Sequence, residues 1–259
     1  MKSRIILILA IFTFSLTACE FFFDCIDGNG NVQTEERAAT SFNSIANETS
    51  FYVEYIESDV VSVTVEAESN IIPHIKTDIR NGCLEVSTTR GTGCVNYTVQ
   101  PRVTITGPSV SELINSGSGD IVAGALTGEE VNIMSSGSGD ITTGTVSCTS
   151  ADLHLSGSGK IHTDAIEAND VRAYVSGSGD IETSGVSGTA KYYLSGSGKI
   201  DAEDLEVDDA DITISGSGSV YTTVLKYLEA SISGSGNVYL TGEPSVTLHR
   251  SGSGKIIYR

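Results

Sequence analysis

The chain has 259 residues, with 33 acidic and 15 basic side chains and a formal net charge of −18. So acidic a body repels nucleic acid and anionic lipid headgroups, which excludes nucleic-acid binding as its function. Tryptophan is absent and aromatic residues make up 7% of the chain, so a deep sugar-stacking cleft is disfavoured.

Residues 1–18 have the layout of a secretory signal peptide. Lys2 and Arg4 precede an apolar stretch, residues 5–14, which is too short for a permanent membrane span. The tripeptide Leu-Thr-Ala then precedes Cys19 and resembles the lipobox of bacterial lipoproteins. The resemblance implies cleavage before Cys19 and acylation of that cysteine, and several acyl chains anchor a protein stably. We expect a lipid-anchored envelope protein, in the outer membrane and facing periplasm or exterior; the alternative is an ordinary secretion signal.

Residues 19–37 and 38–115 show two different patterns. The first segment has no apolar period, so we predict a lipidated cysteine followed by a flexible tether. In the second, apolar and polar residues alternate, as in Phe51–Tyr55, Val61–Val65 and Val103–Ile105. Alternation with β-branched residues predicts half-buried strands. We expect this irregular β region to cap the repeats that follow, because terminal repeats must cover an otherwise open core.

The chain has five cysteines, four of which remain if Cys19 is acylated. Cys83 and Cys94 flank a stretch that contains the turn-forming sequence Arg-Gly-Thr-Gly. In an oxidising envelope we predict a disulfide between them. Cys25 and Cys148 have no evident partner. No Cys-x-x-Cys or nearby pair of histidines is present, so we predict neither a metal site nor a cofactor.

Residues 116–259 are built from a repeat. Eight copies of Ser-Gly-Ser-Gly recur at steps of 18 to 20 residues, starting at Ser116, Ser136, Ser156, Ser176, Ser195, Ser215, Ser233 and Ser251. A fixed period of this length is typical of a solenoid, in which each repeat is one coil. We therefore predict an all-β protein whose body is a parallel β-helix of about eight coils.

Aliphatic residues recur at fixed positions when each coil is numbered from its first serine as position 0. Position +5 is always aliphatic, position +10 is aliphatic in six coils and position −1 in five. These positions are Ile121, Ile141, Ile161, Ile181, Ile200, Val220, Val238 and Ile256; Leu126, Val146, Ile166, Val186, Leu205 and Leu225; and Leu155, Val175, Leu194, Ile214 and Ile232. Parallel sheets favour such β-branched interiors, so we expect the three columns to fill the tube.

Strand alternation then assigns the remaining positions. Side chains two residues apart share a face, so the two glycines of each motif face inward, where they let opposite walls approach or the strand bend. The serines and position +4 face outward. A rival assignment turns the serines inward, but each buried hydroxyl would then need a hydrogen-bond partner. At position +4, Asp140, Lys160, Asp180 and Lys199 alternate in sign, so we expect ion pairs between adjacent coils.

The outward serines form a regular hydroxyl array that is a candidate binding face. Its members are Ser116, Ser118, Ser136, Ser138, Ser156, Ser158, Ser176, Ser178, Ser195, Ser197, Ser215, Ser217, Ser233 and Ser235. A flat array of hydroxyls can hydrogen-bond a surface polysaccharide or another envelope protein. The alternative is that serine recurs only because a small residue fits a tight coil.

The mature chain resembles a known family over residues 38–259. The matching features are the Phe42–Ile45 segment, the strand Phe51–Tyr55, the segments Asn81–Val86 and Val103–Ile105, and the repeats from Ser116. The family is that of the auto-transporter adhesin head (GIN) domain, common among Bacteroidetes lipoproteins. The resemblance implies a β-helix-like body in the cell envelope, and it implies no activity and no binding residues.

Two main functional hypotheses follow. The first is a non-catalytic adhesion or binding module that uses the repetitive surface. The alternative is a polysaccharide-processing enzyme, a lyase or glycoside hydrolase, because several such enzymes are parallel β-helices. Stacked Asp120 and Asp140 would place two carboxylates about 5 Å apart, as in retaining glycosidases. No obvious base accompanies them, since the four histidines fall in different columns. A calcium-binding roll is disfavoured because the matching acidic position is lysine in three coils.

The last coil ends at Ile256–Arg259 with no capping segment after it in this sequence. An open solenoid end is a strand edge that can pair with another strand. We expect self-association through this end, unless Lys255 and Arg259 blunt it.

Overall fold

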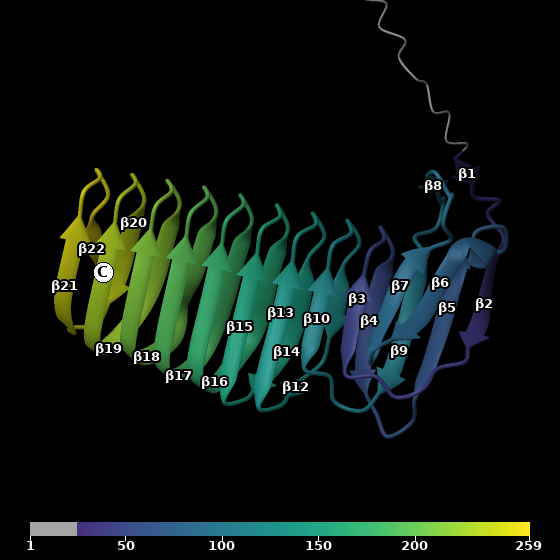
Figure 1. Cartoon of the computed structure of the whole chain (residues 1–259), viewed down its shortest axis with the longest axis horizontal. Coiled ribbons are helices and arrows are strands. Elements are labelled where there is room, and N and C mark those ends of the chain that lie inside the picture. Colours follow the sequence, from purple (N-terminus) through teal and green to yellow (C-terminus); the bar gives the residue numbers. More distant parts are fainter. Residues whose placement is uncertain (1–24) are drawn as a thin grey trace, which may run out of the picture.

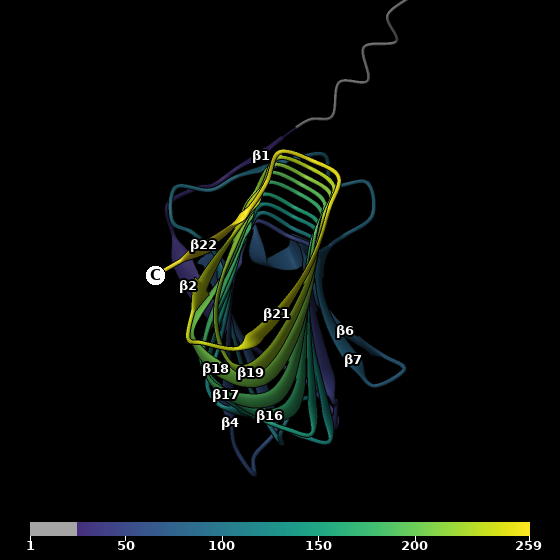
Figure 2. The same ribbon diagram turned by 90° about the vertical axis from the view of Figure 1, so that its left-hand side faces the viewer.

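The computed structural model describes residues 25–259, so the predicted signal peptide, Cys19 and the first part of the tether lie outside the described residues. The described chain forms coils of parallel strands stacked along one axis, with antiparallel strands at the N-terminal end (Figure 1). Viewed along the stack, the tube is narrow at the Ser-Gly-Ser-Gly turns and curved at the opposite edge (Figure 2). The predicted all-β parallel solenoid is confirmed.

Two walls face each other across the tube. Wall A holds the strand before each turn and wall B holds the strand after it. Wall A begins with β3 (Ser44–Asn47), β10 (Glu112–Asn115), β13 (Glu130–Ser135) and β15 (Ser150–Leu155), and wall B with β4 (Tyr52–Glu57), β11 (Ile121–Ala123), β12 (Leu126–Thr127) and β14 (Ile141–Ser147). Four longer strands then run from wall B round the curved edge to wall A: β16 (Lys160–Val175), β17 (Asp180–Leu194), β18 (Lys199–Ile214) and β19 (Ser219–Ile232). The last strands are β20 (Asn237–Thr241) and β22 (Ile256–Tyr258) in wall B and β21 (Ser245–Arg250) in wall A.

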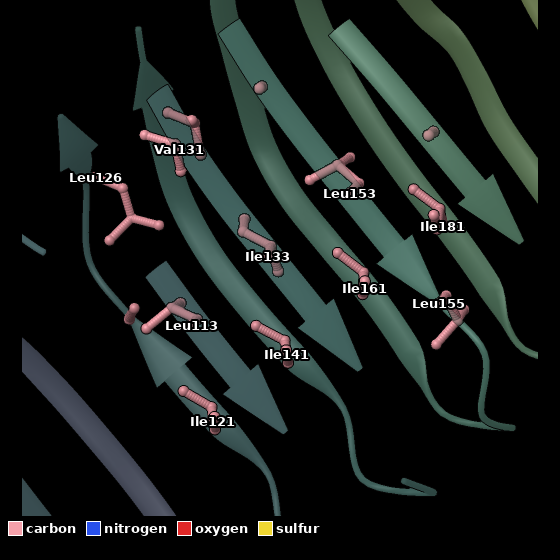
Figure 3. Packing of buried hydrophobic residues seen from close by; sticks show 14 of the residues in the cluster. Leu113, Ile121, Leu126, Val131, Ile133, Ile141, Leu153, Leu155, Ile161 and Ile181 are labelled. Carbon is pink, nitrogen blue, oxygen red and sulfur yellow. The ribbon is translucent and has the colours of Figure 1, made fainter. Parts of the chain in front are cut away.

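The interior is a set of stacked aliphatic columns. Ile121, Ile141, Ile161 and Ile181 pair in register from coil to coil and are fully buried (Figure 3). The five aliphatic residues at position −1 are buried as well. Each fully buried side chain of this size contributes about 1.5–3 kcal/mol relative to an exposed one. Positions −1 and +5 therefore face inward as predicted.

Position +10 departs from the prediction in two coils. Leu126, Val146, Ile166 and Leu205 are buried there, whereas Val186 and Leu225 are 54% and 52% exposed. The coil that starts at Ser176 is one residue shorter than its predecessor, so Gly185 rather than Val186 aligns with Ile166 and Leu205. In the coil that starts at Ser215, Val224 aligns with Val207 and takes the buried place next to Leu225. The shorter coils thus shift the inward position by one residue.

The glycines serve a purpose other than the one predicted. A Cβ atom at Gly137 would lie 1.8 Å from the carbonyl oxygen of Gly117, and one at Gly157 would lie 1.8 Å from that of Gly137. The missing side chains therefore make room along the stack, for the preceding turn, and not for the opposite wall. The same close approach lets the N–H of Ser138 donate a 3.1 Å hydrogen bond to the carbonyl oxygen of Gly117.

The tube begins before residue 116. β3 and β4 pair in parallel with β10 and β11 on one side, and with β7 (Cys83–Thr88) and β9 (Arg102–Gly107) on the other. Antiparallel strands then close this end: β6 (Ile75–Arg80) on β7, β5 (Ser62–Glu68) on β9, and β2 (Val32–Arg37) on β5. A single 3-10 turn, η1 (Ile72–His74), precedes β6. Residues 38–115 thus supply the first walls of the solenoid as well as its cap.

The predicted tether is largely structured from residue 25 onward. β1 (Ile26–Asp27) pairs with β8 (Val95–Asn96), and β2 is an edge strand of the cap. A disulfide joins Cys25 to Cys94, so the predicted Cys83–Cys94 bond is wrong, and Cys83 and Cys148 are free thiols. Cys83 lies within β7 between β3 and β6, whereas Cys94 lies in the loop next to β1. The prediction failed because it chose the cysteine nearest to Cys94 in the sequence, whereas the fold brings Cys25 next to Cys94.

Glu68 holds the N-terminal segment on the body. Its side chain is fully buried and accepts hydrogen bonds from the N–H of Gly30 (2.5 Å), the N–H of Thr98 (2.9 Å) and the hydroxyl of Thr98 (2.8 Å). Burial raises the pKa of this carboxyl, but the hydrogen bonds from Thr98 and Gly30 outweigh it and leave the pKa below its ordinary value. The ionised form is therefore the one that stabilises the fold.

We predict that Glu68→Gln lowers the stability at neutral pH, because the amide cannot replace a carboxylate that accepts three hydrogen bonds. A carboxyl with a depressed folded pKa contributes stability above its unfolded pKa and loses that contribution as the pH falls through the folded pKa. Urea unfolding should show a gap between variant and wild type at pH 7 that closes as the pH falls below about 4. Glu66→Gln, on the exposed face of the same strand, is the control, and an equal effect of both variants would contradict the role of Glu68.

We predict that Gly177→Ala destabilises the solenoid, because a Cβ atom there would lie 2.0 Å from the carbonyl oxygen of Gly157. Overpacking against backbone costs about 1–3 kcal/mol, and urea unfolding would measure the loss. Ser178→Ala, at the exposed neighbouring position, should change stability by less than about 0.5 kcal/mol. A neutral Gly177→Ala variant would show that the turns are not held at this distance.

Candidate functional site

The serines of all eight motifs are exposed, so their outward orientation is confirmed. The first glycine of each motif is half-buried and the second is buried. Each turn is fixed by backbone hydrogen bonds to the turn before it, as when the N–H of Ser158 donates to the carbonyl oxygen of Gly137 at 3.2 Å. The hydroxyls consequently form two straight columns along the edge of the tube, at positions 0 and +2.

A third column lies at position −2, on the outer surface of wall A. It runs beside the column of serines at position 0, which we call the first serines. Strand register places Ile114, Met134, His154, Tyr174 and Tyr193 side by side in successive coils. The ring of His154 stacks on that of Tyr174 with centroids 4.3 Å apart, and Tyr174 stacks on Tyr193 at 4.7 Å. This column was not predicted from the sequence, although aligning the coils at position −2 shows the apolar and aromatic run.

A groove lies between the position −2 column and the first serines. Its first hollow, of about 320 Å³, is lined by Ile114, Met134, Ser135, Ser136, His154, Leu155, Ser156, Tyr174 and Ser176. A second hollow, of about 190 Å³, shares Tyr174 and Ser176 with the first and continues to Tyr193, Ser195, Thr213 and Ser215. A third, of about 500 Å³, shares Thr213 and reaches Ser233 and Ser251. We call this chain of hollows the serine groove.

The serine groove divides the predicted binding face. Its walls contain the first serines Ser136, Ser156, Ser176, Ser195, Ser215 and Ser233. None of the second serines, Ser138, Ser158, Ser178, Ser197, Ser217 and Ser235, lines these three hollows, and neither do Ser116 and Ser118. The two serines of a turn therefore differ in surroundings although both are exposed.

The surface of the groove is mainly apolar, with serine hydroxyls along one side, and it carries few charges. No carboxylate lines its three hollows, in a chain whose net charge is −18. Burial raises the pKa of the Tyr174 phenol, and the neighbouring Tyr193 and Asp152 raise it further, so the phenol stays protonated at neutral pH. Because stacked rings cover each other's faces, Tyr174 offers its ring edge and hydroxyl rather than a ring face.

The carboxylates suggested as a catalytic pair have a different environment. Asp120 accepts a 2.9 Å hydrogen bond from the N–H of Asp140, and Asp140 accepts one of 2.7 Å from the N–H of Lys160. Both side chains thus fasten one coil to the next and lie outside the serine groove. Of the histidines, His154 lines the first hollow, His249 the third, and His162 lies 3.2 Å from Asp164 on the outer surface of wall B.

The expected ion pairs along position +4 are absent from residues 25–259. Lys160 pairs instead with Glu182, and the ammonium of Lys199 lies 2.9 Å from the carboxylate of Asp201 in its own coil. Asp120 and Asp140 accept backbone N–H groups, and Lys160 and Lys199 pair with carboxylates at position +6. Across the same residues, no group of three His, Cys, Asp or Glu side chains is arranged to hold a metal ion.

Comparisons with known proteins agree with this architecture. A family model described as "Putative auto-transporter adhesin, head GIN domain" matches residues 41–244. A sequence comparison with curated proteins gives no match. Among the helices that residues 25–259 form, none has the length and apolar character needed to cross a bilayer.

Three solved structures resemble the chain over nearly its whole length. A "putative lipid binding protein" from Parabacteroides distasonis has a TM-score of 0.86 and 26% identity, and the alignment covers 91% of this chain and 99% of that one. A "putative adhesin" from Parabacteroides merdae has a TM-score of 0.85 and 24% identity, with the same coverage. A "putative adhesin" from Bacteroides fragilis has a TM-score of 0.64 and 20% identity, covering 90% and 100%. At the two lower identities the likeness shows the fold alone.

Proposed function

Since the chain belongs to the auto-transporter adhesin head (GIN) domain family, we propose that it is a non-catalytic binding module of the bacterial cell envelope, anchored by acyl chains on Cys19. The module binds an extended ligand along the serine groove. One observation carries this proposal: the three hollows join end to end across successive coils, with a serine hydroxyl in register at each step.

The ligand with the matching chemistry is a linear neutral polysaccharide. Parallel coils repeat about every 4.8 Å, so the groove presents hydroxyls at a constant interval to a polymer that itself repeats along its length. Serine and tyrosine hydroxyls both donate and accept hydrogen bonds, as sugar hydroxyls do. The net charge of −18 repels acidic polysaccharides and anionic membranes, which favours a neutral chain.

Binding explains the groove better than catalysis does. The enzyme alternative, a polysaccharide lyase or glycoside hydrolase, needs a carboxylate pair or a base beside the bound sugar. Asp120 and Asp140 are occupied by backbone N–H groups outside the groove. The histidine that lines the first hollow, His154, stacks on Tyr174, and no carboxylate lines that hollow.

We predict that Ser156→Gln combined with Ser176→Gln weakens polysaccharide binding at least tenfold, about 1.4 kcal/mol, because the longer side chains fill the groove. Ser158→Gln combined with Ser178→Gln is the matched control, with the same substitutions in the same two turns outside the hollows. Binding would be screened on an array of linear neutral and acidic glycans and then titrated with the best soluble chain.

Three results would contradict the proposed function. If the two double variants weakened binding equally, the groove would not be the binding site. Binding to phosphatidylcholine vesicles but to no glycan would point to the lipid chemistry named for the Parabacteroides distasonis protein. Release of shorter sugars from any polysaccharide would show that the protein is an enzyme.

We predict that Cys19→Ala moves the protein from the membrane fraction to the soluble fraction of cells, because it removes the acylated side chain. Cys148→Ala is the control, since this free thiol lies in the body. Immunoblots of separated fractions measure the distribution, and protease treatment of intact cells then reports whether the body faces the exterior. Retention of Cys19→Ala in the membrane would rule out this anchor.

A further inference from the structure

The N-terminal segment of the described chain lies beside the column of turns. β1 pairs with β8, and the disulfide joins Cys25 to Cys94 next to this pair. Just after β8, the hydroxyl of Tyr97 donates a 3.2 Å hydrogen bond to the carbonyl oxygen of Ser50. Ser50 lies in the turn between β3 and β4, on which the first Ser-Gly-Ser-Gly turn stacks. β1 therefore lies at the edge of the tube that the turns occupy (Figure 1 and Figure 2).

The edge formed by the turns carries no net charge. We call positions 0 to +4 of the eight motifs the turn edge. Its serines are exposed, and its charged side chains lie at position +4, where three aspartates are matched by three lysines. These residues are Asp120, Asp140 and Asp180, and Lys160, Lys199 and Lys255. The turn edge is thus a row of hydroxyls that an anionic surface does not repel.

The opposite, curved edge is strongly acidic. Between position +8 of each motif and position −6 of the next, the seven connections hold eleven acidic side chains and one lysine. Glu206 of this edge lies seven residues beyond Lys199 along β18, which places about 20 Å between the two edges. In physiological salt, charges are screened over about 8 Å. A bilayer that touches the turn edge is therefore beyond the reach of this negative charge.

The cap is less suited than the turn edge to an anionic surface. β1 leads into β2 of the cap and also adjoins the turns, so either surface could face a membrane that holds Cys19. At the cap, however, β2 and β5 expose Glu35, Glu36 and Glu66. Repulsion between these carboxylates and anionic lipids disfavours the cap as the contact surface and leaves the turn edge.

We propose that the turn edge lies on the headgroups of the membrane that anchors the chain, and that the serine groove binds the sugar headgroup of a neutral glycolipid in that same membrane. This inference rests on the proposed function, because it needs both the acyl anchor on Cys19 and binding in the groove. It adds the source of the ligand: the glycan belongs to the membrane on which the solenoid lies, and not to a neighbouring cell.

The serine groove has the position and the chemistry that a glycolipid requires. It runs along the turn edge, so a bilayer under that edge brings lipid headgroups to its mouth. Its serine hydroxyls match sugar hydroxyls, while Ile114 and Met134 offer apolar surface at the end nearest β1. Tyr174 and Tyr193 add rings with a polar tip, which are favoured at membrane interfaces because one end is apolar and the other is hydrated. An amphipathic groove thus meets an amphipathic ligand.

The first test measures the orientation of the acylated full-length protein on mixed phosphatidylcholine–phosphatidylglycerol vesicles that carry a quencher on their lipid headgroups. A fluorophore is attached at Ser197→Cys on the turn edge or at Glu206→Cys on the curved edge of the same coil, with Cys83→Ser and Cys148→Ser in both proteins. We expect severalfold stronger quenching at position 197. Equal quenching, or stronger quenching at position 206, would overturn the orientation.

Flotation of the same vesicles separates this result from failure of the anchor. Protein that floats with the vesicles but shows equal quenching keeps the anchor and loses the orientation. Protein that does not float refutes the acyl anchor, and the present inference with it. Circular dichroism of each labelled variant checks that the fold is retained.

The second test identifies the source of the glycan. Vesicles contain a neutral diglycosyl glycerolipid with a photoreactive group on its sugar, and mass spectrometry maps the crosslinks on the anchored protein. We expect crosslinks in the serine groove that fall about tenfold in Ser156→Gln combined with Ser176→Gln. Thr149→Gln combined with Asn169→Gln is the control, because both residues are exposed away from the turn edge.

Two results of the second test would overturn the inference. Equal crosslinking of the two double variants would place the glycolipid outside the groove. Groove-dependent binding of a soluble glycan without any crosslink to the glycolipid would leave the proposed function standing, and would show that the ligand does not come from the anchoring membrane.

Discussion

The distance between successive turns governs the rest of this molecule. Each Ser-Gly-Ser-Gly turn lies so close to the carbonyl oxygens of the turn before it that a Cβ atom at either glycine would overlap them. Glycine at positions +1 and +3 is thus a steric requirement of the stacking. Once the turns stack in this way, the strands that leave them are in register, and the aliphatic columns align inside the tube.

The same stacking determines how side chains are arranged on the outer surface. A straight pile of identical turns repeats each outward position at the interval of the coils, so a single side-chain type becomes a column. Serine at position 0 and aromatic residues at position −2 form the two sides of a groove in this way. At position +4, Asp120 and Asp140 accept backbone N–H groups of the next coil, although the sequence suggested that Asp140 would pair with a lysine. Along each coil, positions that stabilise the stack therefore alternate with positions that we propose for binding.

Much of this fold could be predicted from sequence because the repeat makes each position visible several times. The inward isoleucines at +5 and the outward serines were predicted for that reason. Prediction failed where the period changes or ends: Val186 is exposed because its coil lost one residue, and Cys94 pairs with Cys25 because β1 returns to the body through non-local pairing. The groove was not predicted because the serine column and the aromatic column are seen to form its two sides only when the coils are superposed.

The Cys25–Cys94 bond acquires a mechanical meaning beside the proposed acyl anchor on Cys19. Six Cα–Cα steps separate Cys19 from Cys25, so the body stands no more than about 22 Å from the bilayer surface while the bond is intact. Reduction would leave this point attached only by the two-residue pairing of β1 with β8. If that pairing also opened, Gly30, held by Glu68, would become the attachment point, and the leash would lengthen to about 40 Å. The disulfide thus reinforces the short strand that sets how far the solenoid can swing from the membrane.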